Sequence, residues 1–160
     1  MIDRIQQLLE NLESLLTELS ELQLEKQRAL ASLDADELVT LSNQEEVLSS
    51  ELARQSKARD RFAAEQLEET PPLPGAFQRL VRDLPSQTRA MVEDRLARIE
   101  RLADAVKLKA ASNWLLTYRN SQHVDQVLGI IANAANPSHV PGEQASPVAS
   151  GHGLVLDSTA

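Results

Sequence analysis

Three histidines, His123, His139 and His152, are the side chains best suited to metal binding or proton transfer in this chain. Their spacing matches no metal-ligand motif, and the sequence contains no cysteine, which excludes thiolate chemistry and disulfides. The acidic pairs are adjacent in sequence, and neighbours on a helix point about 100° apart, so such pairs do not converge on one substrate atom. We therefore predict no catalytic residue, no metal site and no cofactor.

His123 allows one covalent hypothesis, because histidine phosphotransfer domains are small helical bundles with one exposed reactive histidine. Here His123 is followed by Val124-Asp125-Gln126 and lacks the lysine-glycine context that those domains place after the histidine. The sequence therefore favours a non-enzymatic protein.

The composition is typical of thin helical packing. Only four of the 160 residues are aromatic, namely Phe62, Phe77, Trp114 and Tyr118, so aliphatic side chains must build the core. That suits a coiled coil or bundle better than a thick globular core. The sequence has no uninterrupted apolar stretch of the kind that a signal peptide or a membrane span needs, so we expect a cytoplasmic location without membrane insertion.

Charge is distributed unevenly along the chain. The formal net charge of −8 argues against nucleic-acid binding. Residues 1–69 contain 16 acidic and 7 basic side chains, whereas residues 70–136 contain 6 acidic and 9 basic ones. In one bundle these segments would attract each other across their packing seam. The alternative is that the charges only solvate the helix faces.

The hydrophobic periodicity predicts an all-α protein, an elongated antiparallel bundle or coiled coil of three long helices plus a short C-terminal helix. Leucines at 3–4 spacing define the first helix, and Lys26 interrupts its apolar seam. Asp34 and Glu37 have the spacing of a capping box that starts the second helix, with Leu33 and Leu38 at the spacing of a hydrophobic staple. Because the link is so short, we expect the second helix to run antiparallel to the first.

Prolines after Thr70 end the second helix, and residues 76–83 have the pattern of a short helical turn. A third long helix begins near Gln87. The sequence leaves open whether it breaks near Asn120 before a last apolar segment at 124–135 or continues through it. We expect residues 1–135 to form a single helical bundle domain. The proline, glycine and serine content of residues 136–160 predicts a disordered tail.

Trp114 and Tyr118 interrupt an otherwise aliphatic helix, four residues apart. Such side chains often anchor protein interfaces, because they combine a large apolar area with a polar tip. The alternative is that they fill a wide part of the core. The apolar segment 124–135 has the same two readings, as core or as a face for a partner helix.

The first three helices have a residue pattern that resembles the FlgN-type flagellar export chaperones. In that family an E-x-x-x-A-L segment precedes a capped turn, and the second helix has leucines and a distal arginine. The family usually has a lysine where this chain has Glu45. The resemblance covers about residues 5–135, and its matching residues are Leu22, Glu25, Ala29, Leu30, Asp34, Leu38, Leu41, Leu48, Arg59, Asn113, Leu115 and Leu116.

The resemblance implies a protein that binds the helical C-terminal ends of hook–filament junction proteins and delivers them to the flagellar type III export gate. Its partners would be these amphipathic helices and the export apparatus. On that reading we expect one cargo-binding face, made of Trp114, Leu115, Tyr118, Val124, Val127, Leu128 and Ile131. The alternative is a structural coiled-coil scaffold that packs only with itself and buries these residues in an oligomer.

Overall fold

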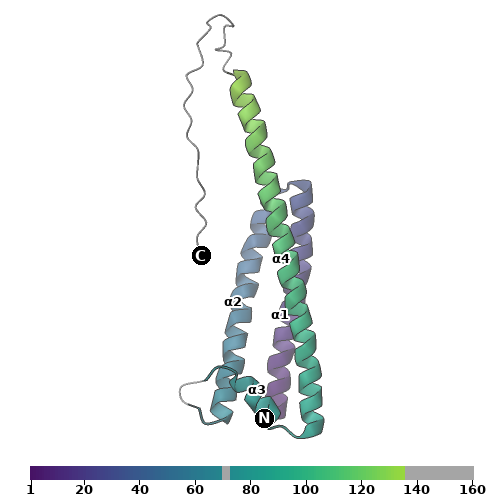
Figure 1. The fold of residues 1–160 in the computed structure, drawn as a ribbon, viewed down its shortest axis with the longest axis vertical. Coiled ribbons are helices and arrows are strands. Elements are labelled where there is room, and N and C mark those ends of the chain that lie inside the picture. The colour runs from purple at the N-terminus through teal and green to yellow at the C-terminus, as the bar shows by residue number, and fades with distance from the viewer. Residues whose placement is uncertain (70–72, 136–160) are drawn as a thin grey trace, which may run out of the picture. The chain divides into compact units, whose positions relative to one another are not determined.

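The computed structural model describes residues 1–69 and 73–135, and within these ranges every regular element is an α-helix (Figure 1). The all-α class predicted from the sequence is confirmed. The helices are α1 (Ile2–Ser32), α2 (Ala35–Gln66), α3 (Ala76–Arg82) and α4 (Ser86–Ala135). Within the described residues, no helix has both the length and the apolar character that crossing a membrane requires.

The chain divides into two compact units, of which the first is Met1–His123 and the second begins at Val124. The predicted tail at 136–160 lies outside the described residues, and the single domain over 1–135 stays a prediction. The expected short C-terminal helix at 124–135 is not a separate element, because α4 is assigned as one helix to Ala135. The short helix is instead α3, at the position where the sequence predicted a helical turn.

A capped turn joins α1 to α2. The Asp34 side chain accepts a hydrogen bond from the Glu37 backbone N–H at 3.0 Å, as the sequence predicted. The Asp34 N–H donates to the Ala29 carbonyl, so it is not left for the Glu37 side chain and the capping box is only half formed. Leu33 adopts a left-handed conformation, with φ 57°, and ends α1 in the manner of a C-cap. Leu33 stays 66 % exposed, so the predicted staple does not bury it.

Within the first unit α2 folds back along α1, and α4 lies on the same hairpin (Figure 1). Three side-chain contacts fix the direction of α4. Arg95 bonds Glu13, Lys109 bonds Ser20 and Asn113 bonds Gln23, across sequence separations of 82, 89 and 90 residues. Because the separation stays nearly constant while both numbers rise, α4 runs parallel to α1. Arg95 also pairs with Glu10, so this one arginine of α4 joins two acidic residues of α1 across their seam.

The core consists of two apolar clusters of different construction. All four helices contribute to the larger cluster. Phe77 of α3 is only 1 % exposed there. The Arg59 guanidinium lies over the Phe77 ring, 5.3 Å from the ring centroid. The smaller cluster draws on α1 and α2, through Leu22, Ala29, Leu41, Leu38 and Leu48. The hairpin therefore has an apolar core of its own near the turn.

The Asp34 cap generates a stability prediction. We expect Asp34→Ala to lower the free energy of unfolding by about 1 kcal/mol, because it removes the acceptor of the Glu37 N–H. Asp34→Asn keeps an acceptor at that position and should leave stability nearly unchanged. Urea denaturation followed by circular dichroism measures both variants. Equal losses for the two would show that the side-chain cap is not the cause.

Candidate protein-binding site

A buried polar layer crosses α1, α2 and α4. The Asn113 amide nitrogen donates to the Gln23 carbonyl at 2.8 Å and to the Gln23 side-chain oxygen at 2.9 Å. The Gln23 amide nitrogen donates to Glu45 at 2.6 Å, and Lys26 donates to the other Glu45 oxygen at 2.5 Å. Gln23 is 2 % exposed and Asn113 is 5 % exposed. Burial of the two amide nitrogens is tolerated because each finds an acceptor.

This layer explains two features of the sequence. Lys26 interrupts the apolar seam of α1 because it pairs with Glu45, which lies between Leu41 and Leu48 on the apolar stripe of α2. Sequence reasoning found the interruption and missed its partner. The signal was present, since Glu45 has the spacing of a stripe position, four residues after Leu41 and three before Leu48.

A groove of about 400 Å³ lies beside the polar layer, and we call it the polar-layer groove. All three long helices line it within the first unit. The Asn113 side-chain oxygen is buried and, within the described residues, accepts no hydrogen bond. The lining residues are Gln23, Lys26, Leu30, Leu38, Ser42, Glu45, Ala110, Asn113, Trp114 and Thr117. The groove thus combines aliphatic walls, an aromatic side chain and a polar floor, which is the usual make-up of a recognition site.

Trp114 and Tyr118 form an exposed aromatic pair next to this groove. Their rings stack with centroids 5.8 Å apart and planes inclined by 10°. Gln122 donates a hydrogen bond to the Tyr118 hydroxyl at 2.8 Å. Trp114 is 68 % exposed and Tyr118 is 50 % exposed, so the alternative that they fill the core is wrong. A stacked, exposed pair of this kind offers a large, rigid apolar surface.

The seven residues of the predicted face do not share one side of α4. On a helix, Trp114 and Tyr118 point about 100–140° from the buried Asn113, whereas Leu115 points about 200° from it. Val124, Val127, Leu128 and Ile131 are separated by three, one and three residues and therefore share a side within the second unit.

All seven predicted residues are nevertheless exposed, and sequence reasoning missed one neighbour. Val127 is the least exposed of the second-unit stripe at 41 %, and Leu128 and Ile131 each reach 57 %. Ile130, which was not predicted, is 69 % exposed on another side of the helix. The four stripe residues together with Ile130 leave aliphatic surface uncovered along the second unit as far as it is described.

The histidines give no sign of a chemical site. His123 is exposed, and the described part of the chain holds no group of three His, Asp or Glu side chains arranged for a metal ion. His139 and His152 lie outside the described residues. Exposed aromatic and aliphatic groups therefore dominate the candidate site, as in a helical protein-binding module.

Comparison with known proteins gives the family. The model of the FlgN family, described as FlgN protein, matches residues 1–144, which is most of the chain. The chain belongs to the FlgN family of flagellar export chaperones, as its residue pattern indicated. No curated protein and no solved structure matched it.

The polar layer generates a second stability prediction. We expect Asn113→Ala to lower the free energy of unfolding by about 2 kcal/mol, because the buried Gln23 oxygen loses its donor. Replacing both partners, Gln23→Leu with Asn113→Leu, should cost less than Asn113→Ala alone, since no unpaired amide then remains between them, and Glu45, which loses Gln23 as a donor, keeps its ion pair with Lys26.

Urea denaturation measures this pair of variants. Ser112→Ala is the matched control on α4, because Ser112 is exposed and bonds only the Leu108 carbonyl one turn earlier. We expect the control to change stability by less than about 0.5 kcal/mol. A double variant that is less stable than Asn113→Ala would contradict the prediction.

Proposed function

We propose that this chain is a cytoplasmic chaperone that binds the helical C-terminal segments of hook–filament junction proteins and delivers them to the flagellar export gate. Membership of the FlgN family supports the chaperone role. The uncovered apolar surface on α4 supports binding of an amphipathic helix. Such a segment buries its apolar side against the chaperone and is thereby kept from premature association.

The observation that carries the proposal is the exposed Trp114–Tyr118 stack at the edge of the polar-layer groove. A cargo helix that inserts aliphatic side chains at i, i+3 or i+4, and i+7 would bury both rings. Aromatic anchors beside a cavity are the positions where interfaces concentrate their binding energy. Within the second unit, the stripe of Val124, Val127, Leu128 and Ile131 offers aliphatic contact of its own to an amphipathic helix. Leu115, on a different side of α4, is the least suited of the predicted residues.

Trp114 is the only tryptophan in the chain, so its fluorescence reports directly on this surface. We expect its emission to shift to shorter wavelength when a synthetic peptide of a junction protein's C-terminal helix binds, because the indole leaves water. Trp114→Ala should lower the affinity for that peptide by about tenfold or more, as measured by calorimetry.

Leu108→Ala is the control for this variant, because Leu108 is 70 % exposed on α4 and does not line the polar-layer groove. It should leave the affinity within about twofold. Unchanged affinity in Trp114→Ala, or an equal loss in both variants, would show that Trp114 is not part of the cargo surface. The chaperone role would then depend on whether the parent protein binds the peptide at all.

The scaffold alternative predicts a different hydrodynamic behaviour. A self-packing coiled coil would sediment as an oligomer that buries the second-unit stripe and would ignore the peptide. For a chaperone, we expect the sedimenting mass to increase by one peptide on addition of the junction-protein segment. Leu128→Asp with Ile131→Asp should abolish this increase, because two carboxylates would be buried against an apolar helix. A shift from oligomer to monomer in that double variant, without peptide binding by the parent, would favour the scaffold.

A further inference from the structure

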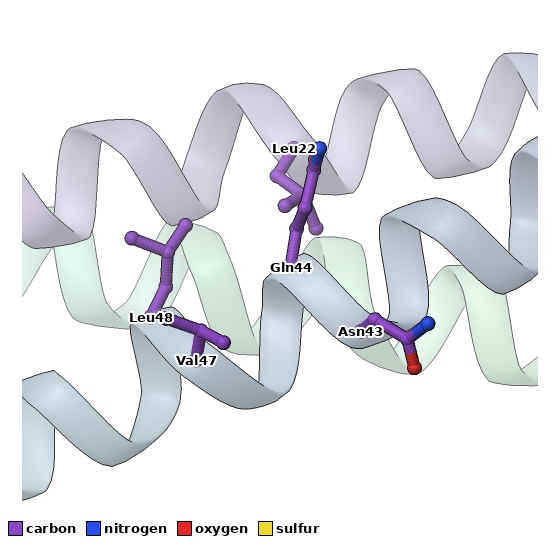
Figure 2. A pocket seen from close by; sticks show the side chains of 5 residues that line it. All are labelled: Leu22, Asn43, Gln44, Val47 and Leu48. Carbon is purple, nitrogen blue, oxygen red and sulfur yellow. The ribbon is translucent and has the colours of Figure 1, made fainter.

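The α1–α2 hairpin has a second groove, which we call the hairpin groove (Figure 2). It encloses about 430 Å³ between Leu22 of α1 and four residues of α2, namely Asn43, Gln44, Val47 and Leu48. In Figure 2, α4 runs behind the two helices that form it. Val47 is 68 % exposed, although it lies on a helix whose partner supplies the buried Leu22. An aliphatic cavity is thus open on the side of the hairpin that α4 leaves uncovered.

Two acidic residues of α1 flank the residue that lines the hairpin groove, although they do not line it themselves. Glu18 and Glu25 lie one turn before and one turn after Leu22, on the side of α1 away from Gln23 and Lys26, which line the polar-layer groove. Both glutamates are exposed, and neither takes part in an ion pair within residues 1–69 and 73–135. Two exposed carboxylates without an ion pair in the described residues therefore flank Leu22 along α1.

The α2 side of the hairpin groove is closer to neutral. Glu51 lies one turn after Val47 and pairs with Arg54 at 2.5 Å. Hydrogen bonds from Arg54 and then from Gln55 lower the pKa of Glu51 to about 2, so its charge persists but is offset by the guanidinium. The α1 side therefore carries two exposed carboxylates without an ion pair, and Glu46, which precedes Val47 on α2, is a third in the described residues.

We propose that the hairpin groove binds a basic amphipathic helix of a partner protein other than the export cargo. An aliphatic side chain of that helix fills the cavity between Leu22 and Val47. Glu18 and Glu25 are seven residues, or about 10.5 Å, apart along α1. A helix lying along α1 meets both glutamates when two Lys or Arg residues, also seven apart, flank its aliphatic residue. The groove is therefore expected to prefer a partner helix with a defined pattern: a Lys or Arg, an aliphatic residue three or four positions after it, and a second Lys or Arg seven positions after the first.

Charge and symmetry disfavour a second copy of this chain in the hairpin groove. A two-fold pairing of groove with groove would bring the Glu18 and Glu25 carboxylates of two copies against each other. A pairing of the groove with another copy's Arg101 and Leu108 on α4 would join two different surfaces. Such a contact is heterologous, so each addition leaves another groove open. A separate basic helix satisfies the groove without either problem.

The test uses the full chain and a fluorescein-labelled helical peptide of about 15 residues, with a central leucine and lysines seven apart around it. Binding is followed by fluorescence anisotropy at low ionic strength. We expect Val47→Asp to lower the affinity for the peptide by about tenfold or more, because a carboxylate then enters the cavity. Val39→Asp is the matched control: it makes the same charge change on the same helix at a 63 % exposed valine outside the groove.

Three further arms keep the proposal falsifiable. Glu18→Gln with Glu25→Gln should weaken binding and flatten its salt dependence, because the counter-charges are gone. A peptide with glutamates in place of the lysines should not bind, and Trp114→Ala should leave the lysine peptide's affinity unchanged. That last result also separates this groove from the cargo surface, whichever way the cargo experiments turn out.

The proposal is overturned if the lysine peptide does not bind, or if Val47→Asp and Val39→Asp weaken it equally. It is also overturned if the glutamate peptide binds as well as the lysine peptide, or if Trp114→Ala alone removes binding. Sedimentation of the protein without peptide adds one more outcome. An oligomer that Val47→Asp dissociates would make a second copy the occupant and would refute the separate partner.

Discussion

The alignment of α4 along α1 depends on one buried amide. The leucines of α1 recur at 3–4 spacing, and such a repeat accepts a neighbouring helix in several alignments about one heptad apart. The alignment that places Asn113 beside Gln23 gives the Asn113 amide two acceptors, at 2.8 and 2.9 Å. A displaced alignment would bury that amide without partners, which costs about 1–3 kcal/mol. The polar layer therefore selects the register that the leucine seam alone leaves open.

The same layer divides the molecule into parts held by different interactions. In the larger cluster, Val92 and Ile99 of α4 are buried with α1 and α3, so apolar contact holds that half of the helix. Past the layer, Asn120 donates to the Leu30 carbonyl at 3.1 Å, and the smaller cluster is built from α1 and α2. Regions with few buried apolar contacts open at lower free energy than a core does. The polar-layer groove lies where polar bonds hold α4 on α1.

Local chemistry was predictable from the sequence, and long-range partners were not. The Asp34 cap, the end of α2 near its prolines and the helical turn at 76–83 each follow from residues within a few positions. Periodicity places Lys26 on the apolar seam of α1. It does not identify the partner of Lys26, because Glu45 is 19 residues away on another helix. Asn120 illustrates the opposite failure. The sequence leaves open a helix break near Asn120, yet the structure continues the helix there and uses the Asn120 amide to hold α1.

The predicted site groups residues that are close in sequence, and it stays a prediction. Trp114 and Leu115 are adjacent, so they point about 100° apart and cannot serve one partner helix equally well. On α1, too, residues that are close in sequence lie on different sides of the helix. Gln23 and Lys26 line one groove, while Glu18 and Glu25 flank Leu22 on the side of the other. Salt screens contacts between exposed charges and has little effect on aliphatic burial. The two proposed surfaces are therefore separable by ionic strength. We expect added salt to weaken binding of the basic helix at the hairpin groove and to leave cargo binding at Trp114 unchanged.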